Sequence, residues 1–248
     1  MIEHDELLTE TPISFGWKTT MANKLFFMIF SIVILALIIL QFFLESIRIP
    51  FYPGINQNAV NFIFNYATAF YIYSTIHLGS LSIGLKFIED KPVSLFSDLF
   101  VSIQTIVINF IATIFFTFII SVPIAIATAI AIYNTEALFL FLLAIIASFI
   151  LALKYQFYPY VIVDLGVNPI QALKISSIIT KNNKLEVFLL HLILVFVNII
   201  GLLCFGIGLL FTIPISVLSC SYQYAQLRGV AIGKVDSYNE PLNAEGQV

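Results

Sequence analysis

The sequence predicts an all-α, polytopic membrane protein with six transmembrane helices and two short elbow helices at the cytoplasmic membrane surface. Of the 248 residues, 60% are hydrophobic and only 10% are charged, whereas an ordinary soluble domain is about one quarter charged. The mean hydropathy is +1.02, so the chain has too little polar surface to cover itself in water. Eleven basic and 14 acidic residues give a net charge of −3 and no basic stripe, which argues against nucleic-acid binding.

Charge-free intervals locate the spans, because a hydrocarbon core about 30 Å thick needs around 20 apolar residues in a helix. An interval at 99–135 has no turn signal before Tyr133, so we expect one helix kinked near Pro123, with two short spans as the alternative. Residues 187–227 are too many for one span, and glycines between Gly201 and Gly208 favour a hairpin there. The predicted spans are about 25–44, 58–84, 100–132, 137–163, 185–203 and 207–228, within a membrane domain at 25–228 and between tails at 1–24 and 229–248.

The basic residues orient these spans. With both termini in the cytoplasm, ten lysines and arginines fall on or near the inside and only Arg48 lies outside, as the positive-inside rule requires. We therefore expect a multi-pass membrane protein with both termini in the cytoplasm. The first apolar segment has no small-residue cleavage site after it and is expected to stay in the mature chain. Cys204 and Cys220 are interpreted as apolar packing residues.

Two cytoplasmic connections share a pattern of an acid, a polar residue, a proline and a short helix. Residues 87–92 lead into 93–100, and residues 163–169 lead into 170–180. Proline suits the first helical position, and Asn168 is a competent N-cap. Asp98 and Asp164 are interpreted as caps where these helices start, accepting backbone amide hydrogens. The pattern indicates two surface elbows and a repeat of helices two and three in helices four and five. Convergent helix starts remain the alternative.

The second connection and the last helix also carry a family resemblance. The matching stretches are residues 158–164, residues 168–176 and the run from Gly206 through Pro214 to Tyr222 and Tyr224. Together they resemble a broad group of six-span bacterial membrane proteins of unknown function, which is similar to the membrane domain of membrane-bound glycerophosphodiester phosphodiesterases. The resemblance covers about the last 100 residues and implies a six-span fold in the bacterial cytoplasmic (inner) membrane. It does not imply phosphodiesterase activity, because no soluble phosphodiesterase domain is present in these residues.

Polar residues inside the predicted spans are the candidates for function, because burying them is costly unless they are paired or hydrated. A stripe on the second helix begins with Asn58, Asn61 and Asn65, and the fifth helix carries His191 and Asn198 in a seven-residue row with Lys184. A polar groove opening outward is one interpretation. Interhelical hydrogen bonding, with a snorkelling lysine at the end of the row, is the interpretation we favour.

The sequence shows no motif for catalysis, a cofactor or a metal, so we expect none of these sites. Lys174, Lys181 and Lys184 surround the second elbow and are candidates for binding lipid headgroups, although topology alone also explains them. We expect a non-catalytic membrane component with a scaffold, assembly or lipid-interacting role. A small transporter or channel along the second helix is the alternative. The expected partners are membrane lipids, with other membrane proteins or a homo-oligomer left open and nucleic acid excluded.

Overall fold

The structure, a computed structural model, describes residues 10–46, 57–133, 138–204 and 206–244. Helices are the only regular elements in these residues, which confirms the all-α class. They are α1 (Pro12–Ala22), α2 (Lys24–Ser46), α3 (Gln57–Ile88), α4 (Leu95–Leu99), α5 (Ile103–Tyr133), α6 (Leu138–Tyr155), α7 (Tyr158–Leu165), α8 (Pro169–Ile179), α9 (Lys184–Leu203) and α10 (Leu209–Ala244).

Four helical stretches are long and apolar enough to cross a membrane: Lys24–Ser46, Leu95–Ile132, Phe139–Leu165 and Lys184–Leu203. In the most apolar window of each, at most 28% of the residues are buried. Exposed apolar surface on this scale requires a hydrocarbon environment, so the chain has the features of a membrane protein. The second and sixth predicted spans fall on α3 and the first half of α10, which are helical but less apolar. Six spans therefore remain a prediction.

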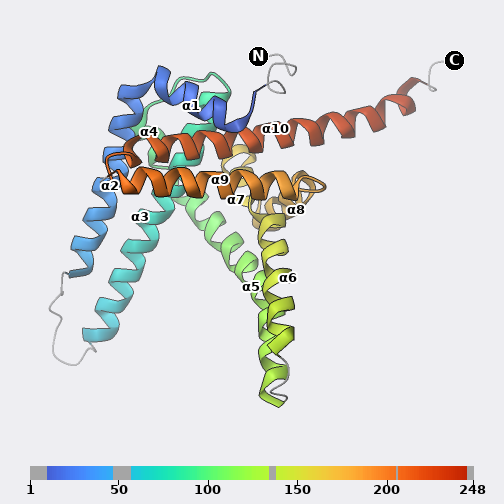
Figure 1. Ribbon diagram of the computed structural model, residues 1–248, viewed down its shortest axis with the longest axis horizontal. Coiled ribbons are helices and arrows are strands. Elements are labelled where there is room, and N and C mark those ends of the chain that lie inside the picture. Colours follow the sequence, from blue (N-terminus) through green and yellow to red (C-terminus); the bar gives the residue numbers. More distant parts are fainter. Residues whose placement is uncertain (1–9, 47–56, 134–137, 205, 245–248) are drawn as a thin grey trace.

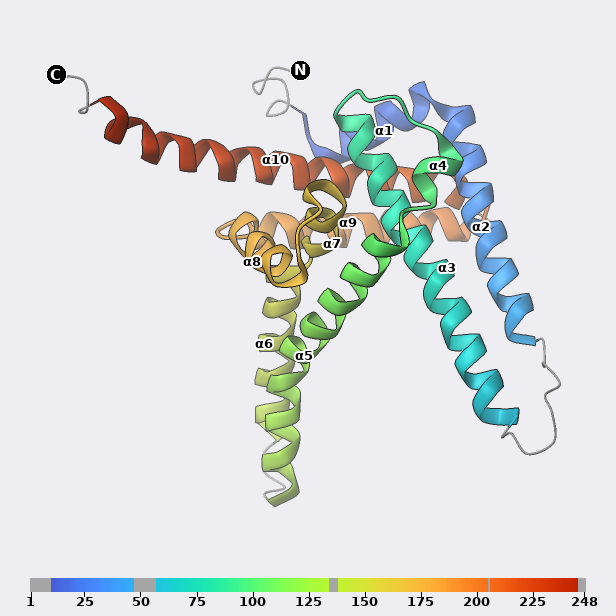
Figure 2. The same ribbon diagram turned by 180° about the vertical axis from the view of Figure 1, so that it is seen from behind.

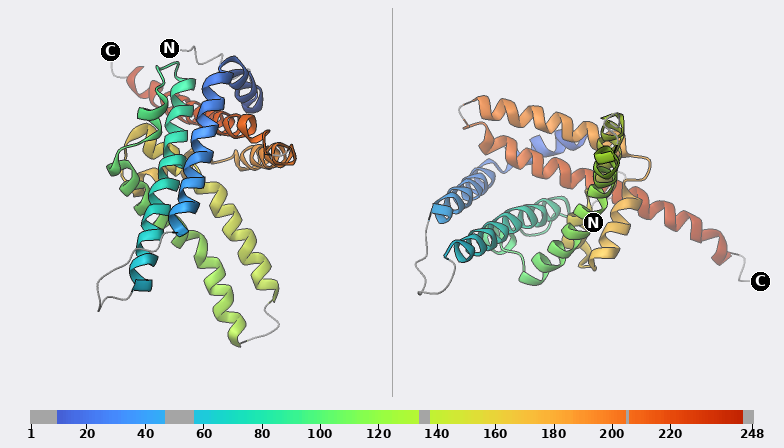
Figure 3. Two further views of the ribbon diagram at one scale, coloured as in Figure 1. Left: turned by 90° about the vertical axis from the view of Figure 1, so that its left-hand side faces the viewer. Right: turned by 90° about the horizontal axis from the view of Figure 1, so that it is seen from below.

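The long helices do not form a parallel bundle. Two hairpin-like pairs, α2 with α3 and α5 with α6, project in the same general direction, whereas α9 and α10 run crosswise over their upper ends (Figures 1 and 2). Side and bottom views show the same arrangement (Figure 3).

Small residues bring α10 close to its neighbours at this crossing. A Cβ on Gly16 of α1 would lie 2.7 Å from the carbonyl oxygen of Ile215, and one on Gly84 of α3 would lie 3.0 Å from Cβ of Ser221. These two positions are therefore limited to glycine as the helices stand. The apolar core lies at the same place. One cluster joins Phe157 and Val161 to Tyr224, and a second includes Phe27, Phe30 and Leu218.

The predicted helix over 137–163 is wrong in one respect, because it breaks between Tyr155 and Tyr158. Pro159, in the first turn of α7, has no amide hydrogen and therefore cannot make the backbone hydrogen bond that a continuous helix needs. Ser176 of α8 and Thr180, which directly follows α8, bond the freed backbone groups: Phe157 N donates to Ser176 Oγ at 3.1 Å, and Thr180 Oγ1 donates to the carbonyl of Lys154 at 2.7 Å.

The third interval is one helix, α5, with Pro123 inside it, as predicted. The predicted break between the last two helices is also present, because α9 ends at Leu203 and α10 begins at Leu209. Close packing there depends on a glycine, since a Cβ on Gly201 would lie 2.6 Å from Oγ1 of Thr212. Helices occur at both predicted elbows, as α4 and α8. Their position at a membrane surface stays a prediction.

Candidate functional site

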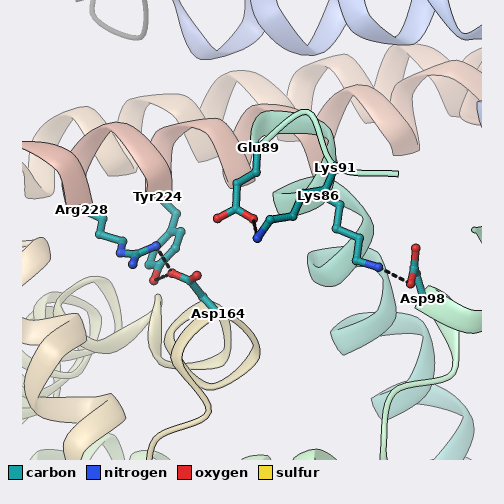
Figure 4. Close-up of polar contacts among 7 residues, drawn as sticks. All are labelled: Lys86, Glu89, Lys91, Asp98, Asp164, Tyr224 and Arg228. Atoms are coloured by element: carbon teal, nitrogen blue, oxygen red, sulfur yellow. Dashed lines mark hydrogen bonds and ion pairs between the residues drawn. The ribbon is translucent and has the colours of Figure 1, made fainter. Parts of the chain in front are cut away.

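A charged junction lies where the end of α7 meets α10 (Figure 4). Oδ2 of Asp164 accepts hydrogen bonds from Tyr224 Oη at 2.7 Å and from Arg228 Nη1 at 2.5 Å. Tyr224 is fully buried and stacks on Tyr160 of α7, with ring centroids 5.2 Å apart. The carboxylate therefore joins two elements that are 60 residues apart in the chain. The expectation that Asp164 caps the start of a helix is wrong, because it lies in the last turn of α7.

A second ion pair joins α3 to the first elbow. Nζ of Lys86, in the last turn of α3, lies 2.6 Å from Oδ1 of Asp98, which is 8% exposed. The other carboxylate oxygen accepts the backbone amide of Ser94 at 2.8 Å. Asp98 therefore accepts a backbone amide hydrogen, as expected, although it lies within α4 and not before its first residue. The contact holds this short helix against α3, where Gly79 permits close approach to Leu99.

A third pair stands between the first two (Figure 4). Nζ of Lys91 lies 2.6 Å from Oε2 of Glu89 on the exposed surface. The hydrogen bond and charge of Glu89 raise the pKa of Lys91, the charge of Asp164 raises it further, and the charge of Arg228 lowers it. The connection after α3 and the end of α7 therefore lie in one electrostatic environment. We call the seven residues of Figure 4 the charged junction: Lys86, Glu89, Lys91, Asp98, Asp164, Tyr224 and Arg228.

The charged junction pairs each of its carboxylates with a cation. Three acids, Glu89, Asp98 and Asp164, face three bases, so the residues sum to zero charge. Within the part of the chain that the structure describes, no group of three or more His, Cys, Asp or Glu side chains is arranged to hold a metal. Paired groups of this kind position helices. They offer neither a free general base nor an activated nucleophile.

The residues of the candidate polar groove come from two helices, α3 and α9. Asn61 and Asn65 lie on α3, and the side chain of Asn58 lies outside the described residues. On α9, Asn198 Nδ2 donates to Ser216 Oγ of α10 at 2.7 Å. His191 Nδ1 donates to the carbonyl of Val187 at 2.8 Å. These two side chains are engaged within the α9–α10 hairpin.

The candidate lipid-headgroup lysines follow one another around the second elbow. Lys174 is exposed on α8, Lys181 is exposed in the turn after it, and Lys184 is the half-buried first residue of α9. None of the three forms an ion pair with the described residues. Asn168 caps α8 as predicted, because its Oδ1 accepts the amide of Gln171 at 2.9 Å.

Sequence reasoning missed the contact between Asp164 and α10 and the buried polar stripe beside it. Ser219, Ser221 and Gln223 are at most 5% exposed. The available signal was the run of serine, tyrosine and glutamine at 219–224, which interrupts the apolar residues of the sixth predicted span. Such a run indicates a helix that packs against other helices more than against lipid.

Comparison with known proteins identifies the family of this chain. No curated protein and no solved structure matches the chain. One family model matches residues 89–236, which is more than half of the chain and runs from the first elbow into α10. All of the charged junction except Lys86 lies inside the matched range. The chain therefore belongs to the family described as Domain of unknown function (DUF7847).

Proposed function

We propose that the protein is a non-catalytic integral membrane protein with a lipid-interacting role. One observation carries this proposal: the ion pairs of the charged junction and the Asn198–Ser216 hydrogen bond lie within the protein, while the apolar sides of the long helices stay exposed. Ion pairs and side-chain hydrogen bonds of this kind hold helices together. Exposed apolar helices are stable where lipid surrounds them. A scaffold or assembly role would use the same exposed surfaces for protein partners.

The lysines of the second elbow provide the test of the lipid role. We propose that Lys174, Lys181 and Lys184 attract the phosphates of anionic lipids, each contributing about 1 kcal/mol near the surface. Replacing all three with glutamine should lower the phosphatidylglycerol and cardiolipin that co-purify, as measured by mass spectrometry. A Lys24→Gln variant, which removes an exposed lysine at the start of α2, is the control. Unchanged retention in the triple variant, with normal insertion, would refute the lipid role.

The topology that we propose has six spans in the bacterial cytoplasmic membrane, both termini in the cytoplasm and α4 and α8 as surface elbows. The length and apolar character of α9 support a span there. Because α9 and α10 run crosswise to the other long helices (Figure 1), six spans require this hairpin to turn towards them in the bilayer. A hairpin that stays crosswise would leave α2, α3, α5 and α6 as the spans, without α9.

The chain's own cysteines separate six spans from four. Cys204 is exposed directly after α9, whereas Cys220 is partly buried in α10. Six spans place Cys204 outside, so a membrane-impermeant maleimide should label intact cells, and Cys204→Ser should abolish the label. Labelling that appears only in inside-out vesicles would exclude this topology.

A small transporter remains the second candidate, because two buried polar atoms on α3 favour it. Asn65 Oδ1 and Thr75 Oγ1 have no hydrogen-bond partner among the described residues, and water would satisfy them. The cavity of about 510 Å³ between α2 and α3 nevertheless has a mainly aliphatic and aromatic lining, including Leu37, Leu40 and Tyr71. A proton or solute flux in proteoliposomes that Asn65→Leu abolishes would favour the transporter.

A further inference from the structure

A cavity occupies the corner where α9 crosses the upper part of α6, and it deepens the proposed lipid-interacting role, on which this inference rests. Its volume is about 360 Å³, within the lower part of the range for small-molecule sites. Phe149 of α6 and Gln156, which directly follows that helix, line one side, and Phe188, His191 and Val195 line it from α9. Figure 3 shows the crossing of the two helices from below.

One polar group in this cavity lacks a partner. Nε2 of Gln156 is buried and has no hydrogen-bond partner among the described residues. His191 does not supply one, because its Nδ1 donates to the carbonyl of Val187 and its Nε2 lies 3.9 Å from Sγ of Cys220. A buried amide donor left unsatisfied is unfavourable. The cavity therefore favours an occupant that carries a hydrogen-bond acceptor.

The rest of the lining is apolar. The rings of Phe149 and Phe188 meet edge to face with centroids 5.5 Å apart. Leu192 and Val195 continue the surface along α9 and remain exposed. An occupant must therefore present a long apolar portion beside its acceptor, which is the chemistry of an acyl chain next to its ester carbonyl.

Lys184, a positively charged residue at the start of α9, lies on the helix face that lines the cavity. Lys184 precedes Phe188 by four residues, and Phe188, His191 and Val195 follow at spacings of three and four, so all four share one face of α9. Lys184 is half-buried and forms no ion pair with the described residues. Glu186, two residues further on, lies about 200° around the helix and does not neutralise this face.

We propose that the corner cavity binds one acyl chain of an anionic phospholipid. The chain lies against Phe149, Phe188 and Val195, the ester carbonyl accepts the Nε2 hydrogen of Gln156 once this buried amide turns into the cavity, and the phosphate lies beside Lys184. Lys184 therefore gives the preference for an anionic headgroup, and Gln156 strengthens the binding of any glycerol ester lipid. The two substitutions predict different losses.

Tryptophan fluorescence with brominated lipids measures this binding directly. Because Trp17 is the chain's single tryptophan, Trp17→Phe with Phe188→Trp gives a reporter in the cavity. The protein is reconstituted in phosphatidylcholine vesicles that contain brominated phosphatidylglycerol or brominated phosphatidylcholine. We expect phosphatidylglycerol to bind about fivefold more tightly, the factor that corresponds to one surface lysine. Lys184→Gln should remove this preference, and Gln156→Leu should weaken quenching by both lipids.

Three controls keep the outcomes distinct. Gln104→Leu, at an exposed glutamine of α5, should change neither titration. Phe118→Trp, at a 68% exposed position of α5, should be quenched equally by both lipids, and Leu192→Trp repeats the test without filling the site of Phe188. Equal quenching at 188, 192 and 118 would overturn the cavity site and leave the lipid-facing role intact. Absence of quenching at all three would overturn both.

Discussion

Replacing Asp164 with asparagine should loosen α10 from the end of α7. The carboxylate accepts hydrogen bonds from Tyr224 at 2.7 Å and from Arg228 at 2.5 Å. Asparagine keeps the size of the side chain but removes its charge. The guanidinium and the phenol would then face a neutral amide, and the tie between two segments 60 residues apart would weaken.

The burial of the two partners sets the expected loss in the free energy of unfolding. The Asp164 side chain is 9% exposed and that of Arg228 is 31% exposed, so the pair lies between an exposed pair, worth about 0–1 kcal/mol, and a fully buried one, whose disruption costs about 3–5 kcal/mol. We expect Asp164→Asn to lower the free energy of unfolding by about 2 kcal/mol. Tyr224→Phe, which removes one hydrogen bond to a charged group, should cost about 1.5 kcal/mol.

Thermal unfolding in detergent provides the assay, with a thiol-reactive dye that reports exposure of Cys220 in a Cys204→Ser background. A loss of 2 kcal/mol corresponds to a midpoint lower by about 4–8 °C for a chain of this size. Lys91→Gln, in the neighbouring exposed pair, is the matched control and should change the midpoint little. Arg228→Gln completes a double-mutant cycle with Asp164→Asn. Strictly additive losses, or a wild-type midpoint for both single variants, would refute the direct coupling.

Three further substitutions test the elbows and their contacts by the same unfolding assay. Asn168→Ala removes the side-chain cap of α8 and should cost about 1 kcal/mol; Asn168→Ser should restore most of it. Ser176→Ala leaves the amide of Phe157 without its acceptor and should cost about 1–3 kcal/mol, and a neutral result would mean that the break between α6 and α7 is satisfied in another way. Gly79→Ala places a Cβ 2.6 Å from Cα of Leu99 and should cost about 1–3 kcal/mol through overpacking, whereas an unchanged midpoint would show that α4 moves freely from α3.

The positions of the helices were largely predictable, because each depends on local sequence. Charge-free intervals located the four most apolar helices, and glycines located the turn between α9 and α10. Asn168 was predictable as a cap because a cap needs only the next three residues. The break after Tyr155 was missed because its cause is partly distant: hydrogen bonds with Ser176 of α8 and with Thr180 just after it satisfy the backbone groups at the break.

The contacts between helices were not predictable in the same way. Asp164 was assigned to a helix start because the sequence around it resembles a cap, and nothing local indicates Tyr224 and Arg228 as its partners. The row of Lys184, His191 and Asn198 was correctly placed on one helix, but its bonding depended on residues such as Ser216 and Cys220 across the hairpin. A periodic pattern gives the face of a helix and not the neighbour of that face.

The charged junction and α10 together account for how a splayed set of apolar helices keeps one arrangement. Between helices in lipid there is little hydrophobic driving force, so packing of small residues and polar contacts must fix their geometry. In this chain both kinds of contact gather on one segment of α10: Ser221 packs at Gly84, and Tyr224 and Arg228 bond Asp164. The lipid-facing sides of α5 and α6 need only remain apolar, because lipid accepts many side-chain shapes. The region matched by the family includes the first elbow, Asp164 and this segment of α10, but not α2. The family therefore shares the α7 and α10 partners of the Asp164 contact, whereas Gly84, which packs at Ser221, lies outside the matched range.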